Sequence, residues 1–354
     1  MATFPTTIET DDQNEVAILV DGQRFKYWQS AEVNLSMDSI DTFSFSAPFQ
    51  PEIPKYKTVF QPLSFKPVQV YIGGELVING TMVTVNPAVT ANSRVFSVGG
   101  YSLPGVLNDV NFPAEAYPIE FNNFGLQQIA SYVAGLFGLG TQFDAPAGAL
   151  FERIASEPNE KILSFLIKIA KQRNLIVGNT LEGKLLFTRS TEESAFISLK
   201  EGVLPFLGGS PNYSSQEYFS SITGLAPTTT NKKADNFSAK NPFLLSLRPN
   251  VFKVTDAVSA DVQSTVNAKI GRMFANAIPV PVTVQGWRIP GGELWKPNIK
   301  IKLQSDGMMI YNETEFIIRS VKFTRSTSDQ TTLNLVLPEA FNGKIPGILP
   351  WQVV

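Results

Sequence analysis

The chain of 354 residues contains neither cysteine nor histidine. Without cysteine there is no disulfide framework, no thiolate zinc site, no iron–sulfur cluster and no cysteine nucleophile. Without histidine there is no imidazole metal ligand, no Ser-His-Asp triad and no histidine acid or base. Catalysis would have to rely on carboxylate pairs, Lys, Tyr, or a carboxylate-bound Mg²⁺ or Ca²⁺. The composition therefore disfavours an enzyme, and we expect no cofactor.

Charged residues are also scarce, at 17% of the chain against about 25% in an average soluble protein. The 29 Lys and Arg nearly balance the 31 Asp and Glu, which leaves a formal net charge of −2. A general nucleic-acid-binding protein would carry a basic excess. The balance argues against that class, although it leaves room for a local basic face.

No segment has the pattern of a secretory signal or a membrane span. The first fifteen residues have no basic start and no apolar run, and they end with Asp11, Asp12 and Glu15. The most apolar stretch, residues 162–170, is short and includes Lys168. We therefore expect neither a cleaved signal nor insertion into a membrane.

The length predicts two or three domains, and the first, residues 1–100, has the pattern of strands. Apolar and polar residues alternate over 31–37 and again over 43–47, and Asp21-Gly22 is a hairpin turn signal. Short strands with one apolar face, separated by turns, predict an antiparallel sandwich or barrel.

Residues 101–199 have the pattern of a small α+β module. Helical spacing runs over 124–136, and Ser156 is a candidate N-cap for a second helix with a broad apolar face over 162–170. Two short strands follow it, separated by a turn.

The rest of the chain divides into two further regions. Residues 200–277 combine strand-like pieces, a polar loop at 226–242 and a long helix over about 260–277. Residues 278–354 are a second β block with an extended tail. The predicted fold is mainly β with α+β insertions. It has two tube-like antiparallel β-barrel domains, a small α+β module and a long helix.

The segment at 178–185, GNTLEGKL, has the glycine and lysine spacing of a phosphate-binding loop. Such a loop needs Ser or Thr after the lysine, where this chain has Leu185, and it opens a helix, whereas these residues predict strands. A hairpin turn is favoured. Glu152, Glu157 and Glu160 are close in sequence, which is weak support for a glycosidase pair. We assign no catalytic, cofactor or metal residue.

Two other features admit a binding role. Lys161, Lys168, Lys171 and Arg173 would suit a nucleic-acid backbone, although an exposed helix face is favoured. The apolar tail would either pack on its own barrel or dock on a neighbouring subunit, and both alternatives stay open. Its candidate inter-subunit contacts are Ile345, Ile348, Leu349 and Trp351.

The second β block begins with a Gly-Trp pair, then a segment "Gly, polar, Leu-Trp, x, Pro" that leads into an alternating strand. This pattern resembles the C-terminal barrel of the baseplate hub proteins of Mu-type contractile-tailed bacteriophages. Upstream, residues 160–189 and the long helix resemble other parts of that family, while residues 200–255 match no pattern of it. The motif positions are Gly286, Trp287, Gly292, Leu294, Trp295 and Pro297. For both tryptophans, a position in the hydrophobic core is favoured over a role as an exposed platform for a ligand.

The resemblance implies a structural protein of the virion. Hubs of this family are homotrimers whose subunits each offer two related barrels, so three chains match the six-fold tail tube to the three-fold central spike. The resemblance further implies contacts with other baseplate proteins, passage of genomic DNA through the channel without specific binding, and assembly in the host cytoplasm. The alternatives are a carbohydrate- or receptor-binding tail protein and, less favoured, a carboxylate-based cell-wall hydrolase.

Overall fold

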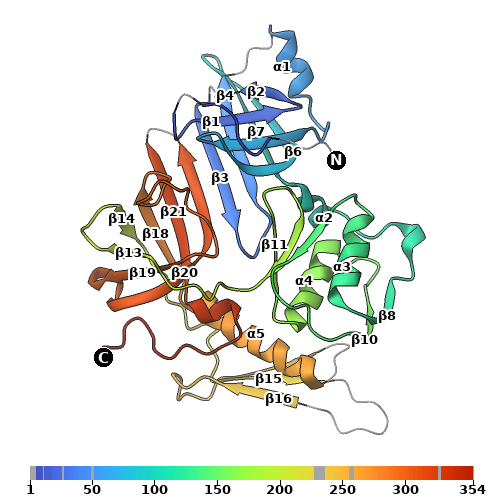
Figure 1. The fold of residues 1–354 in the computed structure, drawn as a ribbon, viewed down its shortest axis with the longest axis vertical. Coiled ribbons are helices and arrows are strands. Elements are labelled where there is room, and N and C mark those ends of the chain that lie inside the picture. The colour runs from blue at the N-terminus through green and yellow to red at the C-terminus, as the bar shows by residue number, and fades with distance from the viewer. Residues whose placement is uncertain are drawn as a thin grey trace.

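The computed structural model describes residues 5–10, 12–25, 28–48, 52–226, 236–254, 259–325 and 328–353, without the side chains of residues 259–261. A curled sheet of 13 strands forms one side of the molecule (Figure 1). In spatial order its main path is β14 (Phe206–Gly209), β18 (Val280–Gln285), β21 (Asp329–Val336), β20 (Ile310–Arg325), β3 (Ser30–Ser36), β4 (Thr42–Pro48), β7 (Arg94–Ser102), β6 (Glu75–Val89), β5 (Pro67–Ile72), β1 (Val16–Val20) and β2 (Gln23–Phe25). Off this path, β19 (Lys300–Ser305) pairs with β20, and β13 (Ile197–Lys200) pairs with β19.

The two β blocks of the sequence are one continuous sheet, because β3 pairs antiparallel with β20. The register places Val33 opposite Phe323 and Leu35 opposite Val321. Register shifts between Met82 and Thr84 in β6, and near Ile318 in β20, let these long strands bend. The prediction of a mainly β fold with α+β insertions and a long helix is confirmed, and the sheet is a curled half-barrel.

The alternation in the sequence corresponds to the burial of each strand. In β3 every second side chain is buried, as for Val33 and Leu35, and β4 buries Phe43 and Phe45 in the same way. Full burial of one such side chain contributes about 1.5–3 kcal/mol. One apolar cluster includes these residues together with side chains of β18 to β21, so both blocks share a core.

A separate α+β unit, defined here as residues 106–188, lies beside the curled sheet (Figure 1). Its hairpin of β11 (Ile176–Asn179) and β12 (Leu185–Thr188) confirms that residues 178–185 are a hairpin turn with its strand ends. The predicted N-cap is wrong: the helix α4 begins at Ile162 after Lys161, and the Ser156 hydroxyl bonds the Glu160 carboxylate at 3.2 Å. The unit contains α2 (Val106–Asp109), β8 (Glu120–Phe124), α3 (Leu126–Gly135), β9 (Thr141–Phe143), β10 (Phe151–Ala155), α4 (Ile162–Gln172), β11 (Ile176–Asn179) and β12 (Leu185–Thr188).

A small sheet of β15 (Ser221–Leu225), β16 (Asn236–Lys240) and β17 (Pro249–Lys253) lies against the long helix α5 (Ser259–Ala277) (Figure 1). The polar loop predicted over 226–242 is therefore corrected at 236–240, which pair antiparallel with β15. A polar side chain on the outer face of a strand has the same local pattern as a loop. Residues 227–235 of that loop lie outside the described residues.

The remaining helices are short. They are α1 (Pro54–Val59) and the 3-10 turns η1 (Leu103–Gly105), η2 (Ala114–Ala116), η3 (Asp306–Met308) and η4 (Pro338–Phe341). Over the described residues, no helix combines the length and the apolar character that crossing a membrane would need.

Helix α5 and η4 approach each other closely at Gly271. A Cβ atom built there would lie 2.8 Å from the carbonyl oxygen of Ala340 and 2.9 Å from that of Glu339. Both obstacles are backbone atoms, which cannot rotate away as a flexible side chain does. The contact therefore depends on glycine.

We predict that Gly271→Ala lowers the free energy of unfolding by about 1–3 kcal/mol, because the methyl group pushes η4 off α5. Gly135→Ala is the matched control, since it also lies in a helix but its Cβ meets nothing within 4 Å. The control should be neutral or slightly stabilising, because alanine favours helix over glycine. Urea unfolding curves compare the two, and equal midpoints would refute the contact.

Candidate interaction surfaces

The two tryptophans of the motif between β18 and β19 are part of the core. Trp287 and Trp295 are 1% and 0% exposed. The Trp287 indole Nε1 donates to the Gln330 carbonyl at 3.1 Å, and the Trp295 backbone N–H donates to the Trp287 carbonyl at 3.1 Å. Gly286 and Gly292 take positive φ angles of 73° and 98°. The segment is thus a folded loop with two buried rings, rather than an aromatic ligand platform.

The remaining motif positions place this loop next to the α+β unit. Leu294 is buried, and Pro297 lines a cavity of about 440 Å³ between the curled sheet and the hairpin of β11 and β12. Asn298, directly after the motif, donates through Nδ2 to the Arg189 carbonyl at 3.1 Å. Its Oδ1 accepts from the Thr191 N–H at 2.8 Å. The motif loop therefore helps to hold the two units together.

Arg288 follows the Gly-Trp pair and ties three distant segments together. Its Nη1 bonds the Glu75 carboxylate at 2.8 Å and the Gly292 carbonyl at 2.6 Å, while Nη2 bonds the Gln13 carbonyl at 2.9 Å. One arginine side chain can bond all of these acceptors because its guanidinium group has five N–H donors in a fixed geometry. The sequence alone predicts no role for Arg288, although its position directly after the Gly-Trp pair places it beside the motif.

Asp41 makes the tightest link between the curled sheet and the α+β unit. Its Oδ2 accepts from Asn179 Nδ2 at 2.8 Å, and its own N–H donates to Asn179 Oδ1 at 2.8 Å. The Ser36 N–H donates to the other carboxyl oxygen at 2.8 Å. Burial raises the pKa of Asp41 to about 7, although the bonds from Asn179 and Ser36 act in the opposite direction. Nothing in the local sequence distinguished this aspartate from a surface one.

The C-terminal tail packs largely on its own chain. Leu349 is 5% exposed, Ile345 is partly buried against the core, and the Trp351 ring meets that of Tyr213 edge-on at 5.1 Å. Ile348 is 41% exposed. Of the two alternatives for the tail, packing on its own barrel accounts for these contacts. A contact with a neighbouring subunit stays a prediction, and Ile348 offers the most surface for it.

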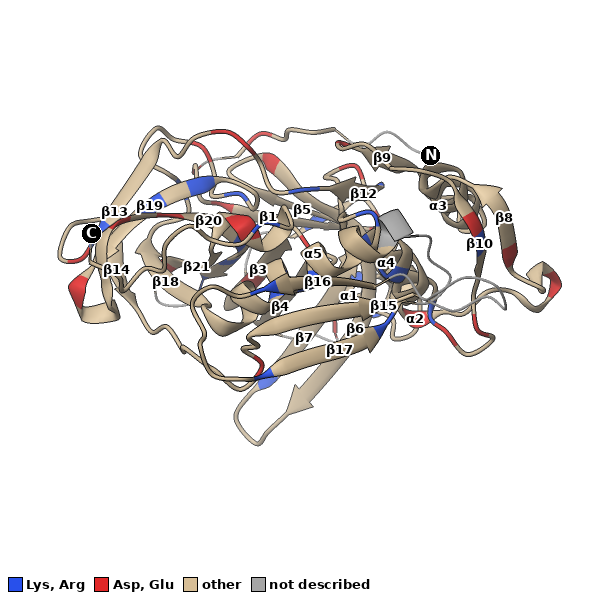
Figure 2. Cartoon of the chain, turned by 90° about the horizontal axis from the view of Figure 1, so that it is seen from below, with Lys and Arg blue, Asp and Glu red and all other residues tan. Residues whose placement is uncertain are grey.

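The lysines and arginine of α4 do not form a track for phosphates. Lys161 donates to the Asp109 carbonyl at 2.6 Å, and Lys168 pairs with Glu160 at 2.9 Å. Arg173 is 5% exposed and stacks on the Phe151 ring at 3.8 Å, so the expectation of an exposed position is wrong for this residue. Seen from below, basic and acidic residues are scattered over many of the same elements of the described chain (Figure 2).

Large apolar side chains are exposed at one end of the curled sheet, at and near the terminal strand β14. We call this set the β14 patch. A terminal strand offers unpaired backbone groups, and exposed apolar side chains beside it are typical of contact surfaces. The β14 patch consists of Val203 and Leu204, just before β14, and of Leu207 in β14, which are 54%, 68% and 47% exposed.

Two loops expose further apolar side chains. Leu63 and Phe65, in the segment that follows α1, are 87% and 62% exposed. Leu245 and Leu247, in the loop between β16 and β17, are 100% and 89% exposed. The elements that flank these loops, α1 and the small sheet, lie at opposite ends of the long axis (Figure 1).

The comparisons with known proteins agree along the chain. Residues 15–102 match the family model "Mu phage baseplate assembly protein GpP-like, N-terminal", and residues 110–189 match "Baseplate hub protein gp44-like, second domain". The baseplate hub protein gp44 of Escherichia phage Mu is 22% identical over 346 residues, which cover 93% of this chain and 89% of the relative.

Two solved structures share the fold at a TM-score of 0.79 each. The 43 kDa tail protein of prophage MuSo2 from Shewanella oneidensis is 24% identical, with 92% of this chain and 99% of that chain covered. The tail protein from Neisseria meningitidis MC58 is 19% identical, with 94% and 99% covered. The resemblance to Mu-type baseplate hub proteins is confirmed.

We predict that Asp41 makes stability depend on pH. Its pKa is raised in the folded state, so the native protein keeps a proton that the unfolded chain has lost between about pH 4 and pH 7. Stability therefore falls as pH rises through that window, by up to about 4 kcal/mol, since one pKa unit is about 1.4 kcal/mol. Urea midpoints of the wild type and Asp41→Asn across this window measure the effect. Parallel pH profiles would contradict it.

Proposed function

We propose that this chain, a bacteriophage baseplate hub and tail structural protein of the Mu-like type, acts as a symmetry adaptor. In this proposal three copies form a ring that joins the six-fold tail tube to the three-fold central spike and encloses the DNA channel. The protein is a component of the virion baseplate, is assembled in the host cytoplasm and contacts other baseplate proteins. The relatives are baseplate and tail proteins, which favours a structural role without catalysis.

The pairing of β3 with β20 carries this proposal. It joins the two β blocks edge to edge, so each chain offers two adjacent segments of one curved wall. Three such chains supply six segments, which is the number needed to face a six-fold tube. A ring also requires a head-to-tail interface in which two different surfaces meet and the rotation closes.

We propose that the β14 patch forms one side of this head-to-tail interface between subunits. It lies at the end of the main strand path, where a neighbouring subunit can cover both the free strand edge and the exposed apolar side chains. Permanent interfaces are more apolar than the remaining surface, which fits this set of residues.

The exposed loops at the two ends of the long axis are suited to the other partners. We assign Leu63 with Phe65, and Leu245 with Leu247, to contacts with the tail tube, the spike or further baseplate proteins. The net charge of −2 fits a channel through which DNA passes without specific binding, because affinity for phosphates grows with each cation engaged.

Two alternatives have their own tests. Phe124 and Tyr132, 42% and 49% exposed, both lie 5.8 Å from the Phe121 ring, and such an aromatic group suits a carbohydrate ligand. Glycan-array binding that is lost in Tyr132→Ala would favour this function.

The second alternative is a cell-wall hydrolase, which would clear peptidoglycan and lose this activity in Glu160→Gln. This alternative is disfavoured because the Glu160 carboxylate is already paired with Lys168.

We predict that the purified chain has a mass of about three times 38.8 kDa in light scattering coupled to size exclusion. Negative-stain images of the same peak should show rings with three-fold symmetry. If the chain alone is a monomer, co-expression with the spike protein should produce the trimer. A monomer under both conditions would overturn the proposal.

We further predict that Leu204→Asp shifts the trimer toward monomer, because an unpaired carboxylate buried in an apolar interface is strongly disfavoured. Leu150→Asp is the matched control: it introduces the same charge at a leucine that is 57% exposed and lies outside the β14 patch, and should keep the trimer mass. Circular dichroism checks that both variants fold. A trimer that survives Leu204→Asp would exclude the β14 patch from the interface.

A further inference from the structure

A groove of about 640 Å³ lies between α4, α5 and the end of β17. None of the described side chains that line it is acidic. We call it the basic groove, because five of its lining residues are cations, contributed by three elements. These are Lys168 and Lys171 of α4, Lys253 of β17, and Lys269 and Arg272 of α5.

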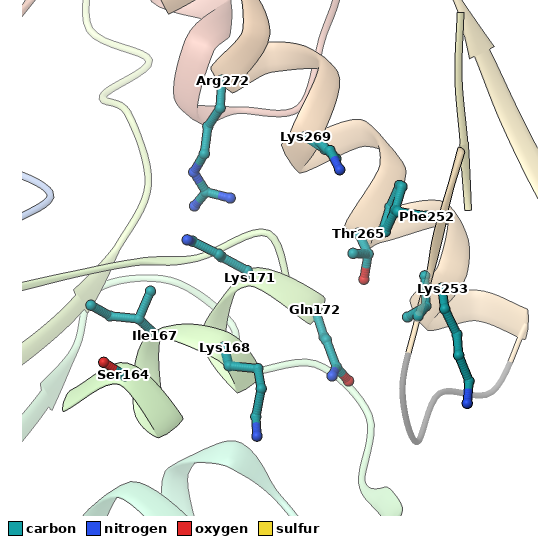
Figure 3. Close-up of a pocket in the computed structure, with 11 residues that line it drawn as sticks. Ser164, Ile167, Lys168, Lys171, Gln172, Phe252, Lys253, Thr265, Lys269 and Arg272 are labelled. Atoms are coloured by element: carbon teal, nitrogen blue, oxygen red, sulfur yellow. The ribbon is translucent and has the colours of Figure 1, made fainter. Parts of the chain in front are cut away.

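Two cations of the basic groove face each other. Figure 3 shows the Lys171 side chain of α4 pointing toward the Arg272 guanidinium of α5 across the hollow. The Lys269 ammonium lies 4.0 Å from the centre of the Phe252 ring, which holds it at the side of the groove. The Lys168 and Lys253 side chains point away from the Lys171 and Arg272 pair (Figure 3).

Acidic neighbours compensate only part of this charge. Glu160 pairs with Lys168 at 2.9 Å, while Asp38, which acts on both Lys171 and Arg272, is itself paired with Arg319 at 3.0 Å. Among the described residues, neither Lys171 nor Arg272 forms an ion pair, and Arg272 donates only to the Leu175 carbonyl at 3.4 Å. Over the described residues, the centre of the groove therefore has more positive than negative charge.

The proximity of the two cations is unfavourable without an anion. Burial lowers the pKa of Lys171, and the nearby Arg272 lowers it further, against the opposing effect of Asp38. Burial likewise lowers the pKa of Arg272 to about 10. A carboxylate between them would relieve the repulsion and accept charge-assisted hydrogen bonds, which are about twice as strong as neutral ones.

We propose that the basic groove binds an acidic peptide segment of a partner protein, with a carboxylate between Lys171 and Arg272. Apolar side chains line the same groove, namely Ile167, Phe252 and Val254, and they suit an apolar neighbour of that carboxylate. A nucleic-acid backbone is a poorer fit, because its regularly spaced phosphates require cations along an extended surface.

Fluorescence anisotropy with the full-length protein tests whether the basic groove binds an acidic peptide. The probe is a labelled Glu-rich peptide that contains one Leu. We expect saturable binding that weakens with added salt, because the groove is open to solvent. Lys171→Glu should weaken it by about tenfold or more, since it places a like charge against the bound carboxylate. Lys184→Glu makes the same charge change at an exposed lysine of the α+β unit outside the groove, and should leave the affinity unchanged.

Competition identifies the ligand class. Displacement of the peptide by duplex or single-stranded DNA at lower concentration than by unlabelled peptide would overturn the proposal in favour of a nucleic-acid site. Binding of inorganic phosphate without peptide binding would also overturn it, as would equal affinities of the Lys171 and Lys184 variants. Both variants should keep the oligomeric mass of the wild type, so this outcome is independent of the symmetry adaptor.

Discussion

The antiparallel pairing of β3 with β20 is the contact on which the rest of the structure depends. It joins segments from opposite ends of the chain, and its register places apolar side chains of both strands in one shared core. Closing such a long loop costs chain entropy, which the long ladder and the buried side chains offset. The same pairing brings Asp38, just beyond β3, to Arg319 of β20, where the two form an ion pair.

The position of the α+β unit follows from that pairing. The turn between β3 and β4 carries Asp41, whose paired bonds with Asn179 hold the hairpin of β11 and β12 against the sheet. Asn298, after the motif loop, bonds the chain just beyond β12. The junction thus depends on backbone and amide groups and on one buried carboxyl group.

The surfaces that we propose as contact sites are of two chemical kinds. Exposed leucines and phenylalanines lie at a sheet edge and on loops, where a partner can exclude water from them. The basic groove is different, because α4 and α5 bring cations to one hollow. Apolar contacts favour association in general, whereas converging charges select a partner of opposite sign.

Local patterns in the sequence determined which face of each strand or helix is buried. The alternation around Val33 and Phe45, the spacing over 162–170 and the hairpin at 178–185 all correspond to the structure. Such patterns are reliable because burial acts on side chains at the fixed spacing of each element. The motif around Trp287 was the local pattern from which we inferred a resemblance to Mu-type baseplate hub proteins.

Only the tertiary structure decided which segments meet. Arg173 has the sequence of an exposed helix end and is buried against Phe151, while residues 236–240 have the composition of a loop and form a strand. The raised pKa of Asp41 and the approach of Lys171 to Arg272 likewise come from partners far along the chain. Burial and Coulomb energy depend on distances in space, and the neighbours of a residue in sequence do not specify those distances.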